Sequence, residues 1–138
     1  WWDLGQRTLE CTKRMMAIEV WAAIRAYGEQ WFGDVVDRQH ALAIELAEKL
    51  RAAPDFELAL APESNIVCYR HVAPGLDGAA LDARNRALRT RVLEDGRFYI
   101  VGVQLPGGYY LRSTIMNPLI ESRDLDELLA HLRTLWPR

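Results

Sequence analysis

The chain has 138 residues, of which 50% are hydrophobic and 26% charged, with a formal net charge of −2 at pH 7. This length is typical of one domain with one hydrophobic core. The near-zero net charge gives no electrostatic reason to expect nucleic acid or an anionic membrane as a partner. No run of 18 apolar residues and no secretory signal pattern occurs, so the sequence predicts a soluble globular protein.

Cysteines and histidines are few and scattered. Cys11 and Cys68 lie far apart and form no C-x-x-C pair, and the three histidines, His40, His71 and His131, are equally scattered. A zinc site needs about four clustered ligands, so no metal site is predicted. Because both cysteines have apolar neighbours, we expect reduced core thiols in a cytoplasmic protein.

The chain begins Trp1-Trp2-Asp3, without an initiating methionine. We therefore expect it to be part of a longer polypeptide. Because exposed aromatic pairs are uncommon on monomeric proteins, Trp1 and Trp2 are expected to pack against a further domain.

Two helices are predicted in the first half of the chain. Over residues 13–27, apolar side chains recur at helical spacing around more than half of the helix, so we expect packing on two sides. Gly28 is a suitable end for this helix. A second helix is expected over residues 31–52, before Pro54. Its predicted apolar stripe comprises Val35, Val36, Leu42, Leu46 and Leu50.

Alternating apolar residues next predict two strands, at residues 56–60 and 66–70. A third helix is expected to begin at Asp77 or Asp82, either of which can cap it, and to reach about Glu94. Its inner face is predicted to comprise Leu81, Leu88 and Val92.

Two further strands are predicted at residues 98–105 and 109–116, joined by a turn at 106–108 (PGG). Ser122 is the expected cap of a last helix, with Asp124 in its first turn, where the helix dipole favours negative charge. The buried face of this helix is predicted to comprise Leu125, Leu128, Leu129, Leu132 and Leu135.

This order of elements predicts an α+β fold with two layers: a small, mostly antiparallel sheet of about four strands with helices on one face. We expect residues 1–138 to form a single domain. Within it, residues 1–30 are expected to be a linking helix region and residues 31–138 the body of the domain.

Common catalytic motifs are absent from the sequence, including phosphate-binding glycine loops and a nucleophile elbow. His40 is predicted to be a surface helix residue. His71, at a strand end, is expected to be structural, and His131 is placed to cap the C-terminal half of the last helix.

Lys13 and Lys49 are the only lysines, and neither has surroundings that would lower its pKa for Schiff-base chemistry. Lys49 is predicted to pair with Glu45, four residues earlier on the same helix. Tyr109 and Tyr110 are read as strand-forming aromatic residues.

Arg112 stands in the middle of the fourth predicted strand. Strand alternation places Leu111 and Ile115 toward the helices. Arg112 then lies on the opposite face, beside Tyr110 and Thr114. A guanidinium among partly apolar neighbours can bind a carboxylate through two parallel hydrogen bonds. A solvated arginine on an open sheet face fits the same pattern, so both interpretations stand at this point.

Four segments in a fixed order carry a family resemblance. They are residues 8–28, with TLECTKRMMAIEVW and RAYG; 62–69 (PESNIVCY); 94–103 (EDGRFYIVGV); and 110–126, with YLRSTIMNP and DLD. Together they resemble the group II pyridoxal-phosphate-dependent decarboxylases, which include glutamate, aromatic amino-acid and diaminobutyrate decarboxylases. The chain is similar to the C-terminal small domain of that family.

The resemblance implies the aspartate-aminotransferase-type fold, in which a large domain binds pyridoxal 5′-phosphate and the small domain closes over the site. The lysine that carries the cofactor follows a histidine in the family's large domain. No His-Lys pair occurs in this sequence, so that lysine and the cofactor-binding domain are expected upstream of Trp1. The chain alone is expected to hold no cofactor and to be catalytically incompetent.

The resemblance also implies roles for individual residues. Arg112 matches the arginine that binds the α-carboxylate of the amino-acid substrate in relatives such as glutamate decarboxylase. Lys13 and Arg14 correspond to a basic pair with a supporting role at the site or the interface. Glu19 stands where the family usually has a basic residue, which implies an altered salt bridge or a divergent subfamily. The whole protein is expected to be a homodimer.

Two other hypotheses remain open. Related pyridoxal-phosphate lyases and aminotransferases share the architecture, because residues outside this chain mostly decide the reaction. Alternatively, the chain is a stand-alone binding or dimerisation module. The presence or absence of a cofactor domain encoded upstream distinguishes this last hypothesis from the other two.

Overall fold

The computed structural model describes residues 14–137, and the chain divides into two compact units, residues 1–34 and 35–138. The predictions for Trp1, Trp2, Cys11 and Lys13 lie outside the described residues. No helix within residues 14–137 is long and apolar enough to cross a membrane.

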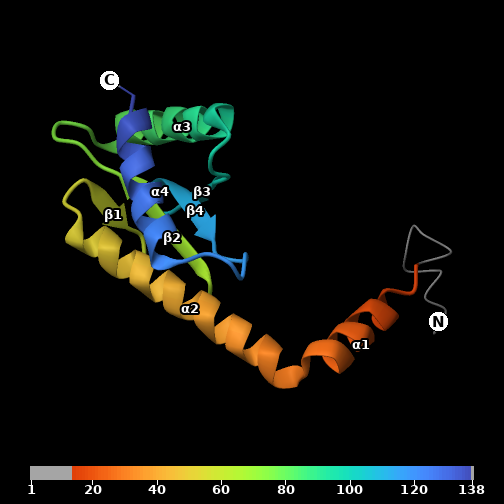
Figure 1. Ribbon diagram of the computed structural model, residues 1–138. Helices are drawn as coiled ribbons and strands as arrows, with labels where there is room; N and C mark the ends of the chain where they lie inside the picture. The colour runs from red at the N-terminus through yellow and green to blue at the C-terminus, as the bar shows by residue number, and fades with distance from the viewer. Residues whose placement is uncertain (1–13, 138) are drawn as a thin grey trace. The chain divides into compact units, whose positions relative to one another are not determined.

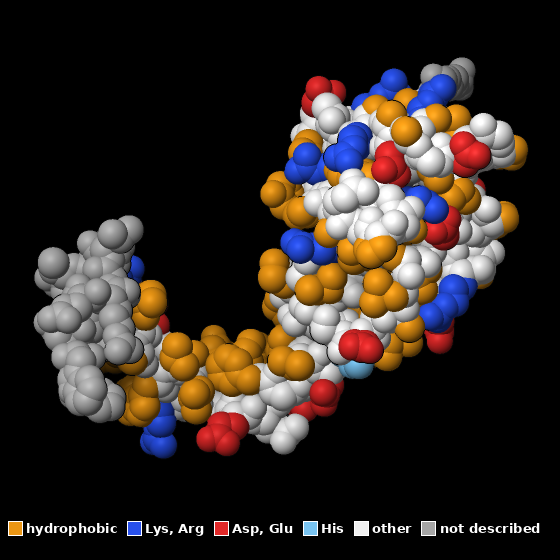
Figure 2. Space-filling model, turned by 180° about the vertical axis from the view of Figure 1, so that it is seen from behind, with side chains coloured by type: hydrophobic (Ala, Val, Ile, Leu, Met, Phe, Trp, Pro, Cys, Tyr) orange, Lys and Arg blue, Asp and Glu red, His pale blue; other side chains and the backbone are white. Residues whose placement is uncertain are grey.

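The first unit contains α1 (Met16–Tyr27) and the start of α2 (Glu29–Ala52). Gly28 ends α1 as predicted, with φ +80° and its N–H donating to the Ile24 carbonyl at 2.8 Å. The expected packing of this helix on two sides is not seen, because α1 has no buried residue within the described chain. Figure 2 shows hydrophobic side chains gathered along this unit. They include Met16, Ile18, Val20, Trp21, Tyr27 and Trp31.

In the second unit, the later part of α2 packs on the sheet. Leu42, Leu46 and Leu50 are buried as predicted, together with two alanines of the same stripe. Val36 is 62% exposed, so its assignment to the stripe is wrong. The physical reason is its position: it precedes Leu42, the first residue of α2 in the hydrophobic core.

The sheet has four antiparallel strands in the order β1-β2-β4-β3. Their bounds are β1 Phe56–Leu58, β2 Ile66–His71, β3 Val101–Leu105 and β4 Gly108–Thr114. This arrangement, with helices packed on one face, confirms the predicted α+β class (Figure 1).

Both edge strands are shorter than predicted, and β4 ends at Thr114, two residues before its predicted end. β1 ends at Leu58, because the chain diverges after Ala59 donates to the Cys68 carbonyl at 2.9 Å. β3 begins at Val101, which pairs with Arg112; residues 98–100 do not pair, although β4 continues to Thr114. Ile100 is nevertheless buried, so this segment contributes to the core without pairing.

The third helix, α3 (Gly78–Asp95), begins one residue after Asp77. Asp77 occupies the N-cap position, but its side chain makes no capping hydrogen bond. Asp82 lies inside the helix, and its carboxylate accepts a 2.8 Å hydrogen bond from the Tyr109 N–H. Asp82 therefore tethers α3 to β4 and does not cap the helix. The predicted inner residues Leu81, Leu88 and Val92 are buried.

The last helix, α4 (Ser122–Leu135), is capped by Glu121 and not by Ser122, which corrects the prediction. The Glu121 side chain accepts from the Asp124 N–H, and Asp124 accepts from the Glu121 N–H at 2.8 Å. This reciprocal capping box frees the Ser122 hydroxyl, which bonds the Glu45 carboxylate of α2.

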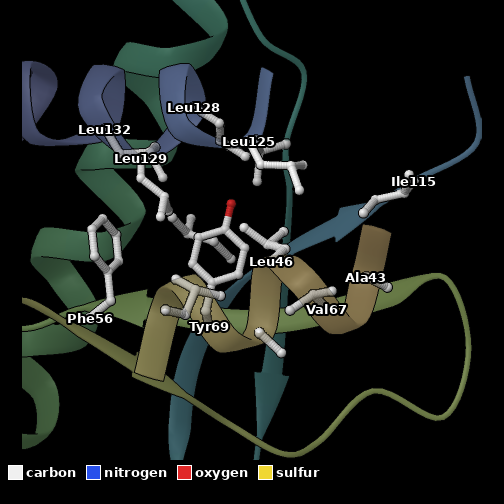
Figure 3. Packing of buried hydrophobic residues seen from close by; sticks show 14 of the residues in the cluster. Ala43, Leu46, Phe56, Val67, Tyr69, Ile115, Leu125, Leu128, Leu129 and Leu132 are labelled. Atoms are coloured by element: carbon white, nitrogen blue, oxygen red, sulfur yellow. The ribbon is translucent and has the colours of Figure 1, made fainter. Parts of the chain in front are cut away.

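One hydrophobic core lies between the sheet and the second-unit helices. Figure 3 shows Tyr69 of β2 pointing toward the leucines of α4, with Leu46 of α2 close by. The Tyr69 hydroxyl shares a 2.9 Å hydrogen bond with Ser113 of β4, so this buried polar group is satisfied. Leu125, Leu128, Leu129 and Leu132 are buried as predicted, and Leu135 is partly buried.

Asn85 of α3 is a buried polar residue that the sequence analysis missed; its side chain is 0% exposed. Its carboxamide accepts from the His71 N–H and donates to the His71 carbonyl, both at 2.9 Å. The neighbouring Val72 N–H bonds Asp55, on the β1 side. Backbone groups of successive strand residues point to opposite sides, so the Val72 N–H points toward β1 and the His71 N–H and C=O point away from it. Asn85 therefore bonds His71 on the side away from β1.

Candidate functional site

The candidate site lies on the open face of the sheet, opposite the helices. Leu111 of β4 and Ile115, the residue directly after β4, are buried in the core, as predicted, which turns Arg112 to the open face. Arg112 pairs in register with Cys68 of β2 and with Val101 of β3. A central strand therefore carries this guanidinium, with a neighbouring strand on each side.

The side chain of Arg112 is half-buried, and its Nε is buried with no hydrogen-bond partner among the described residues. A buried N–H without an acceptor costs free energy, which a bound carboxylate would recover. Of the two interpretations of Arg112, this geometry favours the anion-binding one over a freely solvated arginine.

Cys68 is a free, half-buried thiol on the open face, so its assignment to the core is wrong. Strand alternation explains the difference, because Val67 and Tyr69 on either side of it take the core positions. Burial raises the pKa of the Cys68 thiol, and the Arg112 guanidinium only partly opposes this. The thiol therefore stays protonated near neutral pH and is a poor nucleophile.

A second arginine on this face, Arg70, is fully engaged. Its Nε and Nη2 donate to both oxygens of Glu57 at 2.9–3.1 Å, and its Nη1 donates to the Gly107 carbonyl at 3.0 Å. The Tyr110 hydroxyl donates to Glu57 at 2.9 Å, and the Arg70 guanidinium lies 4.7 Å from the Tyr110 ring centroid. This network is not evident from the sequence, because its members lie on three different strands.

The turn between β3 and β4 is held from two sides. Arg70 bonds the Gly107 carbonyl, and Asp82 bonds the Tyr109 N–H. Gly108 has φ +126°, and a Cβ there would lie 2.6 Å from the Asp82 carboxylate and 2.9 Å from Arg70 Nη1. Glycine is therefore required at this position for both conformation and space.

His71 is structural, as expected, and faces the core. Its ring stacks on Trp136 with centroids 4.1 Å apart, and its Nε2 lies 3.6 Å from Asp55. Asp55 is also held by Arg133 at 2.6 and 2.9 Å. Burial lowers the pKa of His71; Arg133 lowers it further, and Asp55 opposes both.

The other two histidines lie away from the open face. His131 bonds Asp95, at the end of α3, at 2.9 Å, so its predicted role in capping α4 is wrong. It instead joins α4 to α3. His40 is half-buried on α2, less exposed than the surface position predicted.

Lys49 is the one lysine within residues 14–137. It forms ion pairs with Glu45 at 3.4 Å, as predicted, and with Asp126 at 2.6 Å. These contacts, led by the hydrogen bond with Asp126, raise the pKa of Lys49. A protonated amine held in this way cannot form a Schiff base. On α1, Glu19 pairs with Arg14 at 2.6 Å, between two exposed side chains.

Comparison with known proteins places this chain in a family. The model of the pyridoxal-dependent decarboxylase conserved domain matches residues 1–72, more than half of the chain. The chain belongs to the pyridoxal-dependent decarboxylase family. The family relationship thus agrees with the resemblance found in the sequence.

Curated decarboxylases are also similar to this chain. Cysteine sulfinic acid decarboxylase of Mus musculus is 29% identical over 96% of this chain. L-2,4-diaminobutyrate decarboxylase of Acinetobacter baumannii is 25% identical over 94% of it. The chain spans 29% and 26% of these two relatives, respectively.

Solved decarboxylase structures share the fold. A glutamate decarboxylase domain of a diaminobutyrate-pyruvate transaminase and L-2,4-diaminobutyrate decarboxylase from Vibrio parahaemolyticus superposes with a TM-score of 0.84 at 30% identity. It matches 95% of this chain, which covers 28% of that structure. Mouse CSAD in apo form superposes with a TM-score of 0.85 at 26% identity, over 97% of this chain and 30% of that one.

Pyridoxal phosphate is the cofactor of this decarboxylase family. The described residues do not fit a site for holding it. Their single lysine, Lys49, is engaged in ion pairs on the helix layer. The free cation of the open face, Arg112, fits a carboxylate. The part of the family's chemistry that these residues can perform is therefore the binding of an anionic group.

Proposed function

We propose that this chain is the small domain of a pyridoxal-phosphate-dependent amino-acid decarboxylase, and that Arg112 binds the α-carboxylate of the substrate. Under this proposal residues 1–30 link the domains, residues 31–138 form the small domain, and the cofactor-binding domain is supplied by the rest of the polypeptide. The buried, unpartnered Nε of Arg112 is the observation that carries the proposed role. The decarboxylases among the relatives support the reaction class.

The position of Arg112 suits the fixing of a carboxylate in one orientation. A guanidinium presents a planar fork of donors, which can bind both oxygens of a carboxylate at once. The strand that carries it is hydrogen-bonded on both sides, so its backbone has little freedom. Such positioning is worth several kcal/mol of the reaction barrier. The clamp must not stabilise the carboxylate more in the ground state than in the transition state.

The test is turnover of the full-length protein with Arg112 changed. We expect Arg112→Ala to lower kcat/KM for CO2 release at least about 100-fold, because it removes a charge-assisted, two-bond contact. Arg112→Lys should recover only part of this, since an ammonium lacks the planar fork. Arg123→Ala is a matched control, because Arg123 is an exposed arginine of the helix layer. Wild-type kinetics in a folded Arg112→Ala protein would exclude the proposed role.

A homodimer is part of the same proposal. The hydrophobic side chains exposed along α1 and the start of α2 support it, because apolar surface of this kind is typical of interfaces. Sedimentation of the full-length protein tests it: Trp21→Glu should shift the protein toward monomer. A cytoplasmic location remains a prediction from the sequence.

A second candidate reaction has a specific basis. A 4-hydroxyphenylacetaldehyde synthase of Rhodiola rosea is 27% identical over 91% of this chain, so an aldehyde-producing relative shares this domain. Product analysis of the full-length protein distinguishes the two: an amine with CO2 supports the decarboxylase, and an aldehyde supports the second candidate.

A further inference from the structure

The two arginines on the open face, Arg70 and Arg112, differ in how far their guanidinium groups are already hydrogen-bonded within the protein. Arg70 is two residues from Cys68 on β2, and Cys68 is the register partner of Arg112. The arginines are therefore diagonal neighbours on adjacent strands, with Cα atoms about 7–8 Å apart. Long side chains at this spacing can reach one ligand together. In the structure each nitrogen of the Arg70 guanidinium donates a hydrogen bond, whereas the buried Nε of Arg112 has no partner among the described residues.

Glu57 causes this difference. It binds Arg70 through both carboxylate oxygens, leaving the Arg70 side chain 14% exposed, whereas the Glu57 side chain is 42% exposed. The backbone carbonyl of Gly107 accepts from the remaining side of the guanidinium. Arg70 therefore has no free fork with which to bind an anion.

Tyr110 holds Glu57 in this position. Its hydroxyl donates to a carboxylate oxygen that Arg70 also contacts, and its ring lies against the guanidinium. Tyr110 is only 5% exposed, so its ring is fixed by packing. Burial, followed by the Glu57 contact, raises the pKa of Tyr110, which keeps the hydroxyl protonated and able to donate.

We propose that Glu57 is a positioning residue for substrate selection: it withholds Arg70 from anions, so that Arg112 is the one guanidinium on the open face available to a carboxylate. This inference rests on the proposed function of Arg112. The substrate class it implies is an amino acid that presents a single carboxylate to this face. A second acidic group on a substrate would need a partner outside this sheet.

The experiment measures the binding of two amine-free probes to the full-length, cofactor-loaded protein by calorimetry. The probes are pentanoate and glutarate, which have five carbons each and one or two carboxylates. In the wild type we expect their dissociation constants to agree within about threefold, because one guanidinium binds one carboxylate. In Glu57→Gln, glutarate should bind about tenfold tighter, since Arg70 gains a free charged donor, while pentanoate binding stays the same.

Two variants separate this inference from a structural effect. Glu57→Gln combined with Arg70→Gln should return the glutarate constant to the wild-type value, because the released guanidinium is then absent. An unchanged ratio of the two probes in a folded Glu57→Gln protein would overturn the inference while leaving the role of Arg112 intact.

Arg112→Ala supplies a measurement that does not depend on the folding of Glu57→Gln. Weakened binding of both probes supports the inference. Glutarate binding that persists while pentanoate binding is lost would mean that Arg70 is available after all, which overturns it. If pentanoate binds this variant as tightly as the wild type, the proposed function of Arg112 fails, and the inference fails with it.

Discussion

The two faces of the sheet are built from alternate residues of the same strands, yet they differ in kind. On the core face Val67, Tyr69 and Leu111 are completely buried, and the polar pair of Tyr69 with Ser113 is satisfied internally. On the open face Arg70 and Arg112 are half-buried and charged. A strand has a side-chain period of two, so adjacent residues can serve stability and binding separately. The candidate ligand group thereby stands on a rigid part of the domain.

The sharpest way to test this division is to change two consecutive residues of β4. Leu111→Ala should lower the free energy of unfolding by about 3 kcal/mol, because it leaves a cavity in a packed core. Arg112→Ala should change it by less than about 0.5 kcal/mol, since no protein partner is lost at Nε. Urea unfolding of the full-length protein measures both. Equal losses would mean that the open face is also part of the stabilising core.

Asn85→Ala should have the next largest effect, about 2–3 kcal/mol, because it leaves the buried N–H and C=O of His71 without partners. Asn117→Ala is the control: Asn117 is exposed, and its side chain accepts one local hydrogen bond from Leu119. Thermal unfolding compares the two variants. A similar, small decrease in both would show that water replaces the Asn85 contacts.

Gly108→Ala tests the turn between β3 and β4. It should lower the free energy of unfolding by about 1–3 kcal/mol, because φ +126° is strained for any side chain. The new methyl group would also press on Asp82 and Arg70. Gly33→Ala, in the second turn of α2 with its nearest neighbouring atom at 3.9 Å, should be neutral or stabilising. If the two alanine variants unfold at the same denaturant concentration, the turn is not constrained as described.

The smallest expected effect is a pH dependence from His71 on the core face. Its folded-state pKa is lowered, chiefly by burial, so the unfolded chain takes up the proton first as pH falls below about 6.5. Stability should therefore decrease from about pH 7 downward, and His71→Gln should remove this part of the slope. Asp55, whose pKa Arg133 lowers, acts separately below about pH 4. A slope between pH 7 and pH 5 that survives in His71→Gln would contradict this assignment.

Local chemistry made much of the fold predictable. Alternating apolar residues located all four strands, Gly28 ended α1, and the leucines of α4 marked its buried face. Errors arose where a tertiary partner decides the outcome. Residues 98–100 leave the sheet although β4 continues to Thr114, with Ile100 in the core, and Glu121 displaces Ser122 as a cap through its exchange with Asp124.

In the candidate site, too, the features that depend on one strand were predictable, and those that depend on tertiary partners were not. Strand alternation alone placed Arg112 on the open face, because that depends on one strand and its period. The engagement of Arg70 was not predictable, since it depends on a register that brings Glu57, Arg70 and Tyr110 together from three strands. The half-buried position of Cys68 follows from the same register, because the residue opposite it is Arg112.

The amide of Asn85 has a further consequence for the behaviour of the domain at high concentration. An unpaired stretch of strand backbone is a template for pairing with another chain, and hence for aggregation. Where β2 extends past its last pair with β4, Asn85 takes the place of the missing strand residue at His71. A single side chain from α3 thus blocks intermolecular strand addition at the His71 end of this central strand.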